Sequence, residues 1–306
     1  MNYPPVNTAD LVHRLEPPSS PCNVVIDADA YNEIDDQFAI IHALLSDRIN
    51  VEAIYAAPFH NERRSTGGPG DGMEMSFHEI GRLLEMLPID YTGAVARGSE
   101  QFMCCPEQPI QSPAADHLIE RAHADNGSTL YILALGALTN VASALVKEPS
   151  ITTRVTVVTL GGSPYESGHY QDFNFCQDIH AARVIFDSGV AVVHIPGYFV
   201  SEALRTTEPE LAKYVKGSGQ VGDYLYSLYS DWVPDEPGRS KAMWDLAPGG
   251  YLIDPGWTQS HLTQSPILND HYRYGHDLTR HPVRVVTRVD RDRIFSDFFE
   301  LLRKFK

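Results

Sequence analysis

Short apolar runs that alternate with amphipathic stretches constrain the fold of this 306-residue chain more than any other feature. The apolar runs have the length and composition of buried strands, and the stretches between them have helical spacing. The expected strands cover residues 24–26, 51–57, 130–135, 155–160, 190–195 and, late in the chain, 283–289. The expected helices cover residues 38–45, 72–87, 118–124, 140–146, 179–186 and 290–305.

This alternation predicts a single α/β domain with a mostly parallel, Rossmann-like sheet flanked by helices. The late strand is expected at an edge of the sheet. Residues 1–21 are rich in proline and polar side chains, so we expect an N-terminal tail or arm, with the domain covering residues 22–306.

Net charge and the length of apolar stretches argue against two classes of partner, and the cysteines indicate a compartment. The formal net charge of -16 repels phosphate backbones, so nucleic-acid polymers are not expected partners. The longest apolar stretch, residues 130–138, is too short to span a bilayer, so no membrane partner is expected either. The four cysteines form no Cys-x-x-Cys pair, which favours reduced thiols in a cytoplasmic protein.

An acidic cluster follows the first expected strand and precedes the first expected helix. It contains Asp27, Asp29, Glu33, Asp35 and Asp36. Open α/β sheets bind ligands beyond the carboxyl ends of their strands. Converging carboxylates repel one another, and a hard divalent cation that prefers oxygen ligands removes that cost. The cluster therefore predicts a metal site, with calcium favoured over magnesium.

Three other interpretations of this segment can be weighed by spacing. Asp35 and Asp36 could cap the next helix and complement its dipole, but this leaves Asp27 and Asp29 unexplained. A twelve-residue EF-hand loop from Asp27 fails, because it needs glycine and glutamate where the chain has Asn32 and Phe38. A haloacid-dehalogenase-like phosphohydrolase with Asp27 as nucleophile remains an alternative.

Four segments, in order, resemble the nucleoside hydrolase family of the inosine–uridine type. They are Asp27–Ala28–Asp29 with residues 35–40, the turn at residues 133–142, Gly161–Gly162 with residues 171–175, and residues 244–247. The sequence departs from the family in the first segment, where the stretch between Asp29 and Asp35 is two residues longer. The resemblance implies a nucleoside-hydrolase-like fold and calcium-dependent hydrolysis of an N-glycosidic bond.

The resemblance also implies roles for individual residues. Asp29 would be the catalytic base for the attacking water. The implied metal ligands are Asp29, Asp36, Asp245 and the backbone carbonyl of Leu135. The implied substrate-binding residues are Asp35, Asp172, Asn174, Glu166, Asn61 (or its neighbour His60) and Trp244. Asp27 would brace the cluster from behind, and Glu33 could intrude on the site.

The function remains open mainly because the residue that would protonate the leaving base is not evident. Trp244 stands where the family often has a proton-donating histidine, and the substitutes considered are His60, His78, His117 and His169. Tyr165, Tyr170 and Trp244 could form an aromatic wall over a base. The favoured function is a hydrolase of a nucleoside or related riboside. The alternatives are a hydrolase of another glycoside and a non-catalytic sugar- or nucleoside-binding protein. The resemblance also allows a homo-oligomer.

Overall fold

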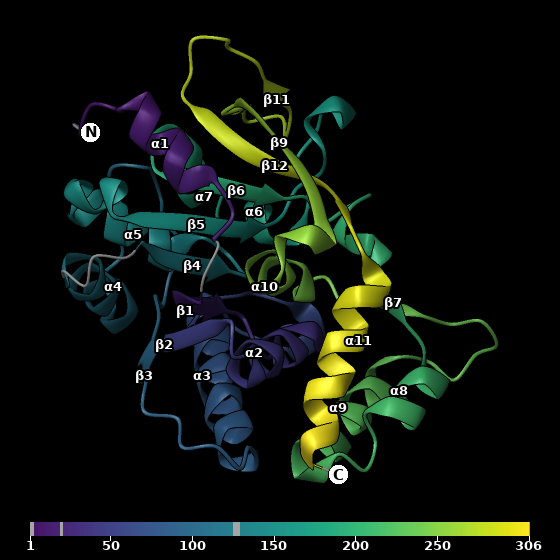
Figure 1. Ribbon diagram of the computed structural model, residues 1–306. Helices are drawn as coiled ribbons and strands as arrows, with labels where there is room; N and C mark the ends of the chain where they lie inside the picture. Colours follow the sequence, from purple (N-terminus) through teal and green to yellow (C-terminus); the bar gives the residue numbers. More distant parts are fainter. Residues whose placement is uncertain (1–2, 19–20, 125–128, 306) are drawn as a thin grey trace.

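The computed structural model describes residues 3–18, 21–124 and 129–305, and its centre is an eight-stranded sheet (Figure 1). The strand order is β3-β2-β1-β4-β5-β6-β12-β9. These strands are β1 (Cys22–Ala28), β2 (Ile49–Ala56), β3 (Ala94–Arg97), β4 (Leu130–Ala134), β5 (Val155–Leu160), β6 (Ala191–Ile195), β9 (Thr258–Gln264) and β12 (Pro282–Val289). Neighbouring strands are parallel except for β9, which runs antiparallel to β12. The predicted single α/β domain with a mostly parallel sheet is therefore confirmed.

The prediction of an edge position for residues 283–289 is wrong. β12 lies between β6 and β9, and β9 forms the edge of the sheet. β9 has the sequence Thr-Gln-Ser-His-Leu-Thr-Gln, which contains no apolar run. β3, at the opposite edge, has four residues. Both edge strands were missed because exposed or short strands carry little hydrophobic signal.

Helices cover both faces of the sheet (Figure 1). One face is covered by α1 (Thr8–Leu15), α2 (Asp35–Leu45), α3 (Pro69–Met86), α8 (Glu208–Tyr214), α9 (Gly219–Trp232), α10 (Leu246–Ile253) and α11 (Arg291–Leu302). The other face is covered by α4 (Pro113–His123), α5 (Thr139–Lys147), α6 (Phe173–Gln177) and α7 (Ile179–Asp187). Val24 and Ile26 of β1 pack into the first layer and Val25 into the second, as the two-residue period of a strand requires.

The N-terminal stretch, expected as a tail or arm, contains a helix that belongs to the hydrophobic core. Leu11 and Leu15 of α1 are fully buried. Nε of Arg284 in β12 donates a hydrogen bond to the carbonyl oxygen of Leu15 at 2.6 Å. Asn7 caps the helix by accepting from the amide of Ala9 at 3.1 Å. An asparagine ahead of residues with helical periodicity was the sequence signal for this helix.

The order of the strands places a crevice beside β1. The chain passes from β1 outward to β2 and β3, and then returns to form β4 on the other side of β1. The loops after β1 and β4 consequently diverge, and such a switch point is where open α/β sheets bind ligands. The first acidic residues lie at this point.

The cysteines and the helix lengths can be compared with the expectations from composition. All four cysteines are free thiols. No helix within the described ranges is both long enough and apolar enough to cross a bilayer.

Candidate active site

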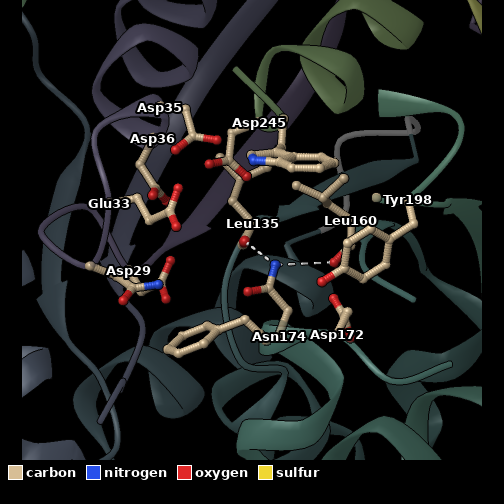
Figure 2. Close-up of a pocket in the computed structure, with 14 residues that line it drawn as sticks. Asp29, Glu33, Asp35, Asp36, Leu135, Leu160, Asp172, Asn174, Tyr198 and Asp245 are labelled. Carbon is tan, nitrogen blue, oxygen red and sulfur yellow. Dashed lines mark hydrogen bonds between the residues drawn. The ribbon is translucent and has the colours of Figure 1, made fainter. Parts of the chain in front are cut away.

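A pocket opens at the carboxyl ends of the central strands (Figure 2). Most of the carboxylates gather on one side of the pocket, and the rest of its wall combines Asp172 with amide, aromatic and aliphatic residues. The lining residues are Asp29, Asn32, Glu33, Asp35, Asp36, Leu135, Leu160, Asp172, Phe173, Asn174, Gly197, Tyr198, Trp244 and Asp245. The structure thus brings together most of the residues singled out in the sequence.

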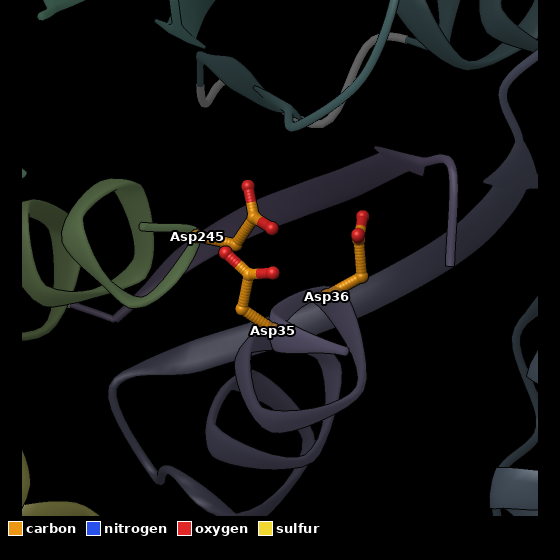
Figure 3. Close-up of side chains that lie close together, drawn as sticks. All are labelled: Asp35, Asp36 and Asp245. Atoms are coloured by element: carbon orange, nitrogen blue, oxygen red, sulfur yellow. The ribbon is translucent and has the colours of Figure 1, made fainter. Parts of the chain in front are cut away.

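Three elements deliver the buried carboxylates. Asp29 follows β1, Asp35 and Asp36 form the first turn of α2, and Asp245 directly precedes α10. All four side chains are buried, with 2–4% of their surface exposed. Carboxylate oxygens of Asp35, Asp36 and Asp245 lie within 4.8 Å of one another (Figure 3). Residues more than 200 positions apart in the sequence therefore share one acidic centre.

The electrostatics of this centre favour a bound cation. Burial raises the pKa of Asp29, Asp36 and Asp245 well above the usual range, and the charges of neighbouring carboxylates raise it further. Asp29 Oδ2, Asp36 Oδ1 and Asp245 Oδ1 are buried without a hydrogen-bond partner among the described residues. Buried anionic oxygens without donors are costly, and a hard divalent cation among the closely spaced carboxylates would reduce that cost. The donor set fits such an ion.

Helix capping does not account for Asp35 and Asp36. The N-cap of α2 is Ile34, and no side chain makes a capping hydrogen bond there. Both carboxylates lie in the first helical turn, where the dipole favours negative charge. Their side chains nevertheless line the pocket.

The turn after β4 brings a carbonyl group and Asp29 close together. The side-chain amide of Asn174 donates to the carbonyl oxygen of Leu135 at 2.6 Å and to that of Leu160 at 3.2 Å (Figure 2). A β-carbon on Gly136 would lie 2.9 Å from Cγ of Asp29. The glycine is therefore needed for this close approach.

The wall opposite the acidic centre combines a carboxylate with aromatic rings. Asp172 is the N-cap of α6 and accepts from the amide of Phe175 at 3.0 Å. Desolvation raises the pKa of Asp172 to about 7, although hydrogen bonds from backbone amides oppose the shift. The rings of Tyr198 and Trp244 meet edge to face with centroids 5.9 Å apart. Phe173 adds a further partly exposed ring to this wall.

Asp27 lies behind the pocket rather than in its lining. It is 1% exposed, and its Oδ1 accepts from the side-chain amide of Asn140 at 2.8 Å. Oδ1 of Asn140 accepts in turn from the amide and hydroxyl groups of Ser99 at 2.7 and 2.8 Å. Burial raises the pKa of Asp27 to about 7. This position suits a residue that braces the cluster.

Two of the expected substrate-binding residues do not line the pocket. Glu166 is exposed on a short 3-10 turn, Tyr165–Ser167, and is absent from the pocket lining. Asn61 is held by Asn32, since its amide donates to Oδ1 of Asn32 at 2.7 Å. Asn32 itself lines the pocket, so Asn61 is linked to the cavity through this hydrogen bond.

The histidines considered as proton donors also lie outside the pocket lining. His60 contacts the hydroxyl of Thr66 at 2.9 Å, and His117 contacts that of Tyr55 at 2.7 Å. His78 is exposed, whereas His169 lines an adjoining pocket that shares Asp172, Phe173 and Tyr198 with this one. Tyr165 and Tyr170 are buried in the hydrophobic core, so Trp244 is the one member of the expected aromatic wall that reaches the pocket.

Sequence reasoning missed several lining residues. They are Asn32, Leu160, Phe173, Gly197 and Tyr198. Gly197 and Tyr198 follow the carboxyl end of β6, as Leu160 ends β5. The rule that ligands bind beyond the carboxyl ends of parallel strands was the signal that could have found these three.

Comparisons with known proteins agree on one family. The family model for inosine-uridine preferring nucleoside hydrolase matches residues 70–296. A putative pyrimidine-specific ribonucleoside hydrolase RihB from Shigella boydii is 28% identical over 165 residues, which is 50% of this chain and 66% of that relative. Probable uridine nucleosidase 1 from Oryza sativa is 29% identical over 145 residues, 45% of this chain and 44% of the relative. The chain thus spans less than two thirds of these relatives.

Solved structures share the fold over most of the chain. The plant nucleoside hydrolase PpNRh1 matches with a TM-score of 0.71 and 20% identity, covering 92% of this chain and 99% of the other. The purine-preferring ribonucleoside hydrolase from Gardnerella vaginalis matches with a TM-score of 0.70 and 19% identity, covering 92% and 98%. At this identity the likeness establishes the fold alone.

Proposed function

Because the chain belongs to the inosine-uridine preferring nucleoside hydrolase family, we propose that it hydrolyses the N-glycosidic bond of a nucleoside or related riboside with calcium as cofactor. The observation that carries this proposal is the trio of buried, unpartnered carboxylate oxygens on Asp29, Asp36 and Asp245. They face a pocket whose other wall offers an amide and aromatic rings. The relatives are named for pyrimidine, uridine or purine ribonucleosides, so the base is left to experiment.

The metal would be held by Asp29, Asp36, Asp245 and the carbonyl oxygen of Leu135. Carboxylates together with a backbone carbonyl suit calcium, which accepts flexible oxygen coordination, better than magnesium. When bound, the ion would supply positive charge that lowers the pKa of an attacking water and stabilises sugar oxygens. The Leu135 carbonyl has two lone pairs, so its hydrogen bond from Asn174 leaves one free.

The chain's own residues would then position the reactants. The Asp29 carboxylate would accept the proton of the attacking water. Asp35 would accept from a sugar hydroxyl, while Asp172 and Asn174 orient the sugar from the other side. A pKa near 7 lets Asp172 donate or accept a hydrogen bond at neutral pH. Such fixed orientation contributes a large share of catalysis in reactions of this kind.

The leaving base would lie against the aromatic part of the pocket. Trp244, Tyr198 and Phe173 all line that part. The indole of Trp244 donates one N–H but has no mobile proton to give, so it would hold the base by stacking.

The alternatives rest on weaker observations. The tryptophan at the usual histidine position and the extra carboxylate of Glu33 favour another glycoside, or binding without hydrolysis, as the second candidate. A phosphohydrolase would need Asp27 at the substrate, and the burial of Asp27 outside the pocket lining argues against that role.

We also propose a small-molecule riboside as the partner and the cytoplasm as the location, which free thiols support. Analytical ultracentrifugation would measure whether the chain forms the homo-oligomer that the family resemblance allows.

Sugar release from a panel of purine and pyrimidine ribosides, 2′-deoxyribosides and O-ribosides tests the proposal. We expect release from at least one riboside with calcium, and loss of at least about a hundredfold after chelation or with Asp36→Ala, because the acidic centre loses its cation. Asp116→Ala, at an exposed carboxylate of α4, is the control and should retain full activity.

The pattern of results separates the candidates. Release that persists after chelation would contradict the metal-dependent mechanism. No release from any riboside, with calcium still bound, would favour the second candidate.

A further inference from the structure

We propose that Lys241 is a built-in counter-cation of the acidic pocket, which pairs with Asp35 and Glu33 and thereby weakens the binding of a divalent metal by the remaining carboxylates. The inference rests on the metal site of the proposed function and adds a residue that tunes it.

The contacts of Lys241 place its ammonium group inside the acidic centre. Nζ lies 2.6 Å from Oε2 of Glu33 and 3.2 Å from Oδ1 of Asp35. It also donates to the carbonyl oxygen of Ala242 at 3.0 Å. The three acceptors match the three hydrogens of the ammonium group. Only 9% of the Lys241 side chain is exposed, so the cation is fixed rather than solvated.

Lys241 is also anchored through its backbone. It belongs to the short strand β8 (Lys241–Ala242), which pairs antiparallel with β7 (Arg205–Thr206). The next residue, Met243, donates its amide to the carbonyl oxygen of Leu204 at 2.8 Å. The ammonium group is therefore held by a braced element against Glu33 and Asp35, two carboxylates that line the pocket.

This cation divides the carboxylates into two groups. Asp35 forms an ion pair with Lys241. Among the described residues, Asp29, Asp36 and Asp245 each keep a buried carboxylate oxygen that has no hydrogen-bond partner. Asp35 lies within the same trio of closely spaced carboxylates as Asp36 and Asp245. The pairing with Lys241 neutralises the charge of Asp35 inside this trio, so fewer uncompensated carboxylates remain for a metal ion.

Glu33 contacts the cation from the turn between β1 and α2. The turn is closed by the amide of Asn32, which donates to the carbonyl oxygen of Asp29 at 2.7 Å. Arg64 braces it from outside, since its guanidinium donates to the carbonyl oxygens of Asn32 at 3.2 Å and Glu33 at 3.0 Å. Figure 2 shows the carboxylates of Glu33, Asp35 and Asp36 gathered on one side of the pocket.

The sign of the effect follows from charge. Burial opposes the charge on Lys241, but Asp35 and Glu33 outweigh burial and raise the pKa of Lys241, so the cation persists. A fixed positive charge beside a divalent ion repels it, and the repulsion is only weakly screened in a buried site. Removing Lys241 should strengthen metal binding, whereas neutralising Glu33 should weaken it, because Lys241 would then be less compensated.

Calcium titration calorimetry at fixed pH and ionic strength tests these opposite signs. We expect the calcium Kd of Lys241→Met to fall by about tenfold or more, and that of Glu33→Gln to rise several-fold, on the order of the Coulomb energies of partly buried pairs. Lys147→Met removes another lysine–aspartate pair, with Asp116, outside the pocket lining. This control should leave the Kd unchanged within about twofold, as expected for a pair screened by solvent.

Each outcome decides the role of Lys241. Unchanged or weaker calcium binding by Lys241→Met, or tighter binding by Glu33→Gln, would overturn the inference. If Lys241→Met does not fold, Glu33→Gln carries the test alone, because the Glu33 side chain is 42% exposed and tolerates the change. A wild-type protein that hydrolyses ribosides and binds calcium, with no shift in either variant, overturns only this inference. A wild-type protein that binds no calcium overturns the proposed metal site and the inference with it.

Discussion

Gly136 illustrates how closely single residues determine this site, because a methyl group there would contact Asp29. We expect Gly136→Ala to lower kcat/KM by about tenfold or more, since displacing a positioned catalytic group by a fraction of an ångström has this effect. The matched control is Gly81→Ala in α3, where an added β-carbon meets nothing within 4 Å. It should retain activity and gain about 0.5–1 kcal/mol of stability. Equal losses of activity in the two variants would contradict the role given to Gly136.

Asn140 is a second residue with a large expected contribution, in this case to stability, because its side chain hydrogen-bonds with the buried Asp27 and with two groups of Ser99. Asn140→Ala would leave these buried polar groups without partners. We expect the free energy of unfolding to fall by about 3 kcal/mol, measured by urea denaturation. Asn50→Ala, which removes an exposed side-chain hydrogen bond, should change it by less than about 0.5 kcal/mol. A similar change in both variants would show that the Asn140 network is not stabilising.

Much of the site was predictable residue by residue, because its acidic motif is local in sequence. Asp29, Asp35 and Asp36 lie within eight consecutive positions after one strand. The contact of Lys241 with Asp35 spans 206 positions, and no local pattern encodes it. Tyr198 likewise comes from a loop with no motif of its own. Long-range pairing is therefore the part that the sequence pattern could not supply.

At the scale of elements, the buried parallel strands were predicted and the edge strands were not. The apolar runs of β1, β4, β5 and β6 reflect burial on both faces, which is the signal that sequence patterns detect. β9 has an exposed, polar sequence, and β3 is short. The helix α1 was missed because a proline-rich context outweighed its cap and its two leucines.

The strand β6 carries a pH-dependent contribution to stability through His194. This fully buried ring contacts the carbonyl oxygen of Gly161 through Nε2 at 2.7 Å, and burial lowers the pKa of His194 to about 4. The unfolded chain takes up the proton near pH 6.5 and the folded chain only near pH 4. Stability supported by neutral His194 is therefore complete above pH 6.5 and lost as the pH falls towards 4.

His194→Gln tests this linkage. On going from pH 7 to pH 4, the wild type should lose about 3 kcal/mol more unfolding free energy than His194→Gln loses. Urea denaturation at several pH values measures it. Parallel pH profiles for the two proteins would show that His194 does not titrate differently on unfolding.

At the scale of the whole molecule, metal binding should be coupled to folding. The acidic centre joins α2, α10 and the end of β1, so an ion bound there ties together segments from both halves of the chain. Calcium at a hundred times its Kd should add about 2.7 kcal/mol to the unfolding free energy. Scanning calorimetry should therefore show a Tm roughly 5 °C higher with calcium than with chelator. Asp36→Asn should abolish most of this difference, and an unchanged Tm in wild type would contradict the coupling.

The two ends of the central sheet bear on how this protein avoids aggregation. An open sheet exposes unpaired backbone groups at its edges, where a strand from another molecule can add. Here one edge is the four-residue β3 and the other is β9, whose exposed residues are polar except for one leucine: Gln259, His261, Leu262 and Gln264. Short and polar edges discourage strand addition. Any self-assembly of the folded chain is therefore expected to use helical faces and leave the sheet at its present width.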